Sequence, residues 1–138
     1  MQKICDANVI LRYLMHDDDT FYENAKKEIL KNPIVPILII SEVVYVLKKV
    51  YLVPRDDIAD SLVKLSDEVE YENLEIVLET LKLFKEENLD FADCYLLARN
   101  KLLNENIATF DNKLNNYLKK MREKKFLYKS PLLGDFYL

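Results

Sequence analysis

The chain has 138 residues, with 24 Asp plus Glu against 20 Lys plus Arg and a formal net charge of -4 at pH 7. This length is typical of one compact domain, so we expect a single domain over residues 1–138. With Gly134 as its only glycine, the chain can form neither a Walker loop nor a Rossmann fingerprint. One histidine, His16, and two separate cysteines, Cys5 and Cys94, argue against a zinc site and a disulfide framework. The chemistry that remains is that of carboxylates.

The charge is unevenly distributed along the chain. A net negative charge argues against a dedicated high-affinity nucleic-acid binder, because such proteins usually carry a basic surface. From Asn112 to Lys129, however, basic residues greatly outnumber the single acid, Glu123. They are Lys113, Lys119, Lys120, Arg122, Lys124, Lys125 and Lys129. A solvated helix face is the simplest interpretation of this run.

The sequence contains no apolar run near the roughly 18 residues that suggest a membrane span. The segment Met1–Asp6 lacks the apolar core of a signal peptide and reaches an acid almost at once. We therefore expect a cytoplasmic protein that does not cross a membrane.

Strands and helices are predicted to alternate along the chain. We expect, in order, a strand at 2–5, helices at 8–15 and 21–30, a strand at 34–40, helices at 42–51 and 56–66, a strand at 69–71, helices at 74–84 and 90–103, a strand at 106–110, a helix at 114–121 and a strand at 126–128. We expect the polar break Asp17–Thr20 to cap the helix at 21–30, and Ser41 to cap the helix at 42–51. The β-branched run Ile34–Ile40 fits a strand buried on both faces, although Pro36 removes one ladder donor. This alternation predicts an α/β fold with three layers, α/β/α, around a central parallel sheet.

Four acids from distant parts of the sequence are predicted to meet at one edge of this sheet. Asp6 and Asp111 end predicted strands, Glu42 follows the buried strand, and Asp93 lies in the first turn of a helix. Ligands of open parallel sheets bind outside the carboxyl ends of the strands. Each acid alone has a simpler explanation as a helix cap or first-turn residue, so the conjunction of the four carries the prediction.

Clustered carboxylates repel one another unless a cation lies between them. Hard oxygen ligands suit Mg²⁺ or Mn²⁺, and such ions polarise a phosphoryl oxygen and activate water. The pattern therefore favours a metal centre that acts on a phosphate ester.

Four segments of the chain resemble, in order and spacing, the motifs of PIN domains. The first has the Asp-x-Asn opening, the second an acid at a predicted helix start, the third an acid in a first turn, and the fourth a Thr-Phe-Asp sequence at the end of a predicted strand. They begin at Asp6, Ser41, Asp90 and Ile107. The resemblance spans nearly the whole chain and is closest to the VapC-type toxins of prokaryotic toxin–antitoxin pairs.

The resemblance implies an α/β/α fold and an endoribonuclease that depends on Mg²⁺ or Mn²⁺. By position, Asp6, Glu42, Asp93 and Asp111 are then both the catalytic acids and the metal ligands. Asp90 is an extra acid, which we interpret as a helix cap rather than a ligand.

Further residues are given supporting roles by the same resemblance. Asn8 and Thr109 occupy positions where PIN domains often have polar residues beside the metal. Lys113 stands where some relatives have another acid, which weakens the case for a second ion. Apart from the resemblance, the position of Arg12 one or two turns beyond Asp6 makes it a candidate phosphate contact, with a salt bridge to a nearby acid as an equally good alternative. The candidate RNA contacts are Arg12, Lys113, Lys119 and Lys120. The implied partners are RNA, a second copy of the chain in a homodimer, and an antitoxin protein.

Three other classes of protein share part of this pattern of acids. A haloacid-type phosphatase requires Asp-x-Asp after the first strand, where this chain has Asp6-Ala-Asn8. A signalling receiver domain requires two adjacent acids there. A catalytically inactive PIN-like module that binds RNA or protein predicts lost acids, whereas all four positions are filled; it stays the main alternative.

Overall fold

The computed structural model describes residues 2–128, with side chains described for residues 2–124. The basic side chain of Lys125 and the whole of Lys129 lie outside this description. The chain divides into two compact units, Met1–Tyr95 and Leu96–Leu138, which are described separately below. The expected single domain over residues 1–138 stays a prediction.

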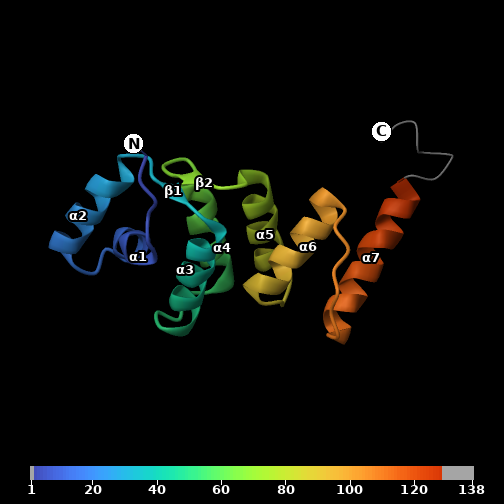
Figure 1. Cartoon of the computed structure of the whole chain (residues 1–138). Coiled ribbons are helices and arrows are strands. Elements are labelled where there is room, and N and C mark those ends of the chain that lie inside the picture. The colour runs from blue at the N-terminus through green and yellow to red at the C-terminus, as the bar shows by residue number, and fades with distance from the viewer. Residues whose placement is uncertain (1, 129–138) are drawn as a thin grey trace. The chain divides into compact units, whose positions relative to one another are not determined.

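Helices dominate the described part of the chain (Figure 1). In order, the elements are α1 (Ala7–Met15), α2 (Asp19–Ile29), β1 (Ile34–Val35), α3 (Ile37–Lys49), α4 (Arg55–Leu65), β2 (Glu70–Tyr71), α5 (Leu74–Glu86), α6 (Phe91–Leu103) and α7 (Asn112–Tyr128). None of the helices in the described part of the chain combines the length and the apolar character needed to span a bilayer.

The first unit contains a small parallel sheet. Strand β1 pairs with β2 in parallel, with Ile34 opposite Glu70 and Val35 opposite Tyr71. Ile4 forms an isolated parallel bridge with Ile34, and the Cys5 N–H donates to the Ile34 carbonyl at 2.9 Å. The predicted α/β class and its parallel pairing are confirmed, whereas the strand expected at 2–5 is reduced to this one bridge.

The strand predicted at 34–40 is wrong beyond Val35. Pro36 has φ -67° and ψ 156° and is the N-cap of α3, and its carbonyl accepts from the N–H groups of Ile39 and Ile40 at 3.0 and 3.2 Å. A proline cannot donate to a sheet ladder, but its fixed φ suits the start of a helix. Ser41 therefore lies inside α3 and does not cap it, which corrects a second prediction.

The two last predicted strands are also absent from the described residues. Residues 106–110 have no strand pairing; the Thr109 carbonyl accepts from the Asn115 side chain at 3.1 Å, and the Thr109 hydroxyl oxygen accepts from the Asp111 N–H at 3.0 Å. These local bonds replace those of a ladder. Residues 126–128 lie within α7, which continues past the predicted end at Met121.

The predicted helices agree with the structure to within a few residues except at the start of α3 and the end of α7. Asp18, in the predicted polar break, caps α2 by accepting a hydrogen bond from the Phe21 N–H at 2.8 Å. Helix α1 packs on α2 and α3, α3 contacts α4, and α4 packs on α5. The core of this unit includes the fully buried side chains of Ile10, Ile40, Ile58, Leu62, Leu81 and Phe84.

Tyr71 on β2 provides a test of this packing. Its hydroxyl is buried and donates to the Leu62 carbonyl at 2.6 Å, and burial raises the pKa of Tyr71 above the ordinary value of 10.0. Replacing Tyr71 by Phe leaves that carbonyl without its donor and should lower the free energy of unfolding by about 1 kcal/mol at pH 7.

The same residue makes stability depend on alkaline pH. Because the pKa is higher in the folded chain, the contribution of Tyr71 is full below about pH 10 and is lost as the pH rises through its folded value. Urea unfolding of wild type and Tyr71→Phe at pH 7 and above pH 10 should show a smaller alkaline loss in the variant. An equal loss in both proteins would contradict this role.

Candidate active site

Asp6 lies where the first chain segment leaves the small sheet and enters α1. It is the N-cap of that helix, and its Oδ1 accepts a hydrogen bond from the Val9 N–H at 3.2 Å. The residue is exposed. A carboxylate has two oxygens and about four acceptor sites, so one capping bond leaves it able to bind a cation as well. The capping interpretation and the ligand interpretation of Asp6 are therefore compatible.

Glu42 occupies a different place from the predicted one. Because α3 begins at Ile37, Glu42 lies in the second turn of the helix rather than at its start. It is exposed, while Val43 and Val44 beside it are buried in the core. The Glu42 carboxylate therefore lies on the solvent-exposed face of α3. Helix α1, which Asp6 caps, packs against α3.

Asp90 and Asp93 occupy different positions at the start of α6. The Oδ1 of Asp90 accepts from the Asp93 N–H at 2.8 Å, and the Asp90 carbonyl accepts from the Cys94 N–H at 3.1 Å. Asp90 is thus a helix cap, as we expected. Asp93 lies in the first turn and is half-buried. The cap of this helix is thus the Asp90 carboxylate, and the assignment of Asp93 as the ligand of the pair stays a prediction.

Asp111 belongs to the second unit. It precedes α7 and caps it, because its Oδ1 accepts from the Leu114 N–H at 3.1 Å. The Thr109 hydroxyl oxygen accepts the Asp111 N–H, so this predicted supporting residue does contact Asp111. Asp111 is exposed and, like Asp6, uses one of its carboxylate oxygens in a cap.

The grouping of Asp6, Glu42, Asp93 and Asp111 around one ion stays a prediction. Among the side chains described for residues 2–124, no three His, Cys, Asp or Glu residues form a group that could hold a metal ion. The predicted ligands are all carboxylates, whose hard oxygens suit Mg²⁺ or Mn²⁺.

Asp6 and Asn8 line a groove between α1 and α2. The groove has a volume of about 490 Å³ and lies entirely within the first unit. Arg12 also lines it, with its guanidinium carbon 3.9 Å from the centre of the Phe21 ring. The predicted alternative, a salt bridge from Arg12 to an acid, does not occur among the described residues; a cation–π contact takes its place.

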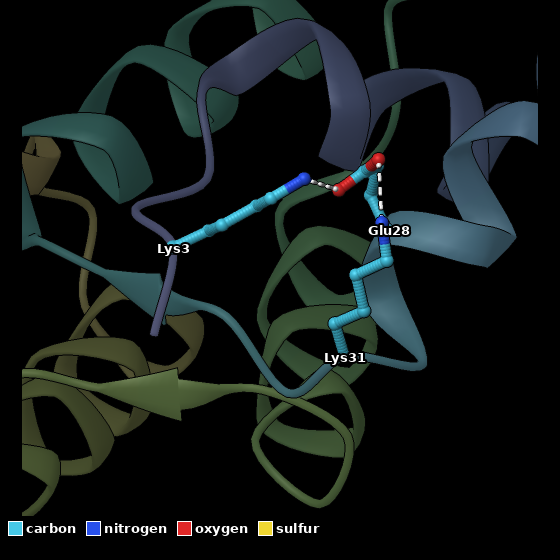
Figure 2. Close-up of polar contacts among 3 residues, drawn as sticks. All are labelled: Lys3, Glu28 and Lys31. Atoms are coloured by element: carbon cyan, nitrogen blue, oxygen red, sulfur yellow. Dashed lines mark hydrogen bonds and ion pairs between the residues drawn. The ribbon is translucent and has the colours of Figure 1, made fainter. Parts of the chain in front are cut away.

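Two further cations of this groove were not among the predicted RNA contacts. Lys27 and Lys31 line it from α2 and the residues just after that helix. Figure 2 shows that Glu28 lies between Lys31 and Lys3, with N–O distances of 3.2 and 3.4 Å. The i, i+4 spacing of Lys27 and Lys31 was the available signal, since residues at this spacing share a helix face.

The cations expected to contact RNA from α7 are exposed. Lys113, Lys119 and Lys120 all lie on this helix, and the Lys120 ammonium is 5.6 Å from the centre of the Tyr117 ring. Their contact with RNA stays a prediction.

The two cysteines beside the acids are packed in the core. Cys5 and Cys94 are both buried free thiols. Burial is the main cause that raises the pKa of Cys5 to about 11 and that of Cys94 to about 12. Both therefore stay protonated near neutral pH and are unsuited to act as thiolate ligands or nucleophiles. His16 is exposed and pairs with Asp19 at 3.0 Å, away from the groove.

Comparison with protein families assigns the chain to a class. The sequence profile of the PIN domain matches residues 3–120, a span that includes all four predicted acids. The chain therefore belongs to the PIN-domain family. PIN domains are generally nucleases, and they typically use divalent metal ions. Comparison with curated proteins and with solved structures found no match.

Proposed function

We propose that this PIN-domain protein is an endoribonuclease that depends on Mg²⁺ or Mn²⁺ and acts as the toxin of a VapBC-type toxin–antitoxin pair. The observation that carries the proposal is the family match over residues 3–120, within which every predicted acid position is filled. We further propose a cytoplasmic protein with three layers, α/β/α.

Asp6, Glu42, Asp93 and Asp111 would hold the ion. When bound, the ion supplies Lewis-acid polarisation of the phosphate and lowers the pKa of a water molecule. The capping bonds of Asp6 and Asp111 fix one oxygen of each carboxylate and thereby the direction of the other. Pre-set ligand geometry lowers the cost of reorganisation during the reaction.

Other side chains of the chain orient the RNA. The Asn8 amide, next to Asp6 in the groove, can donate to a phosphate or accept from water. Arg12 offers planar donors to a phosphate from the same groove, and the exposed lysines of α7 add attraction for the backbone. These contacts offset the unfavourable net charge of the whole chain.

Protein partners are part of the proposal. Leu38 and Tyr45 of α3 keep 76% and 64% of their surface exposed, although both are large and apolar. They lie seven residues apart and so on one face of the helix. Exposed apolar faces often contact other proteins, which supports a homodimer or an antitoxin complex.

A cleavage assay tests the catalytic proposal. Purified protein should cut RNA with Mg²⁺ or Mn²⁺, should lose this activity in EDTA, and should regain it when the metal is restored. The products should end in a 5′-phosphate and a 3′-hydroxyl, because this route does not use the RNA 2′-hydroxyl as nucleophile. Cleavage that persists in EDTA, or products with a 2′,3′-cyclic phosphate, would contradict the proposal. RNA binding without cleavage under every metal condition would favour the inactive PIN-like module.

A further inference from the structure

The groove between α1 and α2 collects cations and an exposed aromatic ring beside Asp6. Four cationic side chains lie in or next to it, against the two carboxylates of Asp6 and Glu28. The cations are Lys3, Arg12, Lys27 and Lys31. Although the whole chain carries a net charge of -4, this part of its surface is positive. A local excess of positive charge in a hollow attracts anionic ligands.

The charges inside the groove are only partly neutralised. Glu28 is shared by Lys3 and Lys31, so one negative charge faces two ammonium groups (Figure 2). The bond from Lys31 is the main cause that lowers the pKa of Glu28, so Glu28 stays ionised at neutral pH. Lys27 makes no ion pair with any residue of the described part. The lysines are therefore available to a phosphate that displaces or joins Glu28.

Phe21 gives the groove a surface for a base. Its side chain keeps 45% of its area exposed and lies under the Arg12 guanidinium. Exposed aromatic rings stack on unpaired bases, and a guanidinium beside such a ring adds to the attraction. The amides of Asn8 and Asn24 line the same groove and can both donate to and accept from base edges.

We propose that the α1–α2 groove binds single-stranded RNA and leads it to Asp6. Lys27, Lys31, Lys3 and Arg12 contact successive phosphates, and Phe21 stacks on a base between them. The volume of about 490 Å³ falls in the range of pockets that hold small ligands, so the groove accommodates the one nucleotide whose base stacks on Phe21, while the cations contact the phosphates on either side of it. The inference rests on the proposed ribonuclease function, and it adds the path by which the substrate reaches the acids.

The combination of groups favours RNA over an acidic protein segment. Lysines alone would suit either partner. The exposed ring matches the faces of bases, whereas the Asp and Glu side chains of an acidic peptide have no ring to stack on it; the two asparagine amides can in addition bond the base edges. A single strand is favoured because its bases are free to stack on a side chain.

The test is a binding measurement on the full chain without metal. Fluorescence anisotropy of a fluorescein-labelled oligouridylate, in EDTA, should give a Kd at least about tenfold weaker for the double variant Lys27→Glu/Lys31→Glu than for wild type. The slope of log Kd against log salt should fall by about 1.4, since each lost phosphate contact removes roughly 0.7 for a single strand. The control Lys26→Glu/Lys64→Glu makes the same charge change outside the groove and should stay near wild type.

Two single variants separate the parts of the groove. Phe21→Ala should weaken binding by about fivefold or more without changing the salt slope, because stacking involves no counterion release. Glu28→Gln should tighten binding several-fold, because it releases Lys3 and Lys31 from their shared acid. If Lys3, Glu28 and Lys31 have a purely structural role, Glu28→Gln should instead bind RNA as tightly as wild type or more weakly.

Each outcome decides between the groove and the nuclease proposal. Equal losses of affinity in the groove variants and in the control would overturn the RNA path. The path would also be overturned if polyglutamate displaced the labelled RNA as effectively as unlabelled oligouridylate does, with both competitors compared at the same concentration of charges. Because the assay contains no metal, RNA bound in the groove but never cut in Mg²⁺ would leave the path standing and overturn the nuclease. If the groove variants bind RNA as wild type does and still cut it in Mg²⁺, the RNA path is overturned and the nuclease proposal stands.

Discussion

Asp6→Asn is expected to reduce RNA cleavage at least about 1,000-fold in kcat while changing the free energy of unfolding by less than about 0.5 kcal/mol. An active-site metal supplies several kcal/mol of charge stabilisation, and each 1.36 kcal/mol corresponds to a factor of ten in rate. Asparagine caps a helix about as well as aspartate, so the bond from the Val9 N–H to residue 6 is kept. The substitution therefore removes the negative charge and leaves the cap. Single-turnover cleavage in Mg²⁺ and urea unfolding measure the two effects.

The structure offers a matched control for this variant. Asp18 caps α2 as Asp6 caps α1, through an Oδ1 that accepts from the Phe21 N–H. Asp18→Asn removes the same charge and keeps the same kind of cap, but lies outside the predicted acids. It should cut RNA like wild type.

Two further variants complete the comparison. Asp93→Asn should be as inactive as Asp6→Asn, since both acids are predicted ligands. Asp6→Ala should be equally inactive and should also lose about 1 kcal/mol of stability, because the cap is gone. If the Asp6→Asn variant cuts RNA at the wild-type rate, Asp6 is not a ligand of the metal, whatever the stability of the variant.

Capping explains how much of the candidate site was predictable. Asp6, Asp90 and Asp111 each accept a backbone N–H at a helix start, which is the simplest explanation of an acid at such a position. The sequence correctly located these starts and assigned Asp90 to a cap. It cannot distinguish an acid that only caps from one that also binds a cation, because the same local position serves both. The grouping of the four acids depends on long-range packing, to which short motifs contribute little.

The fold was predictable where the apolar spacing was regular. The spacing of Leu74, Val77, Leu78 and Leu81 indicated α5, and the structure buries Val77 and Leu81 completely. The run Ile34–Ile40 was ambiguous, because a short apolar segment fits a buried strand and a buried helix equally well. Pro36 decides between them: two residues pair in β1 before it, and α3 begins immediately after it.

Arg55→Ala is expected to lower the free energy of unfolding by about 3 kcal/mol, a large part of the roughly 5–15 kcal/mol typical of a domain. The half-buried Arg55 guanidinium donates to the carbonyls of Phe84 at 3.0 Å and Glu87 at 2.8 Å, and also to that of Leu89. It lies 3.8 Å from the centre of the Phe84 ring. Hydrogen bonds from a charged donor contribute about 1.5–3 kcal/mol each, though not additively. Urea unfolding followed by circular dichroism measures the loss.

Arg55→Lys shows whether geometry or charge matters. A lysine keeps the positive charge, but its compact ammonium cannot reproduce the fork that spans three carbonyls. We expect it to recover less than half of the lost stability. If Arg55→Ala unfolds at the wild-type urea concentration, these bonds contribute nothing to stability.

The position of Arg55 also connects stability to the candidate site. Its three acceptors end α5 and form the turn that leads to Asp90, and Asp90 in turn fixes the first turn of α6 that carries Asp93. In Arg55→Ala protein that is still folded, Asp93 should therefore be less well positioned, and cleavage should need a higher Mg²⁺ concentration for half-maximal rate. Metal titrations of cleavage in Arg55→Ala and Arg55→Lys would measure this shift. An unchanged Mg²⁺ requirement in a clearly destabilised protein would confine Arg55 to the fold and leave Asp93 independent of it.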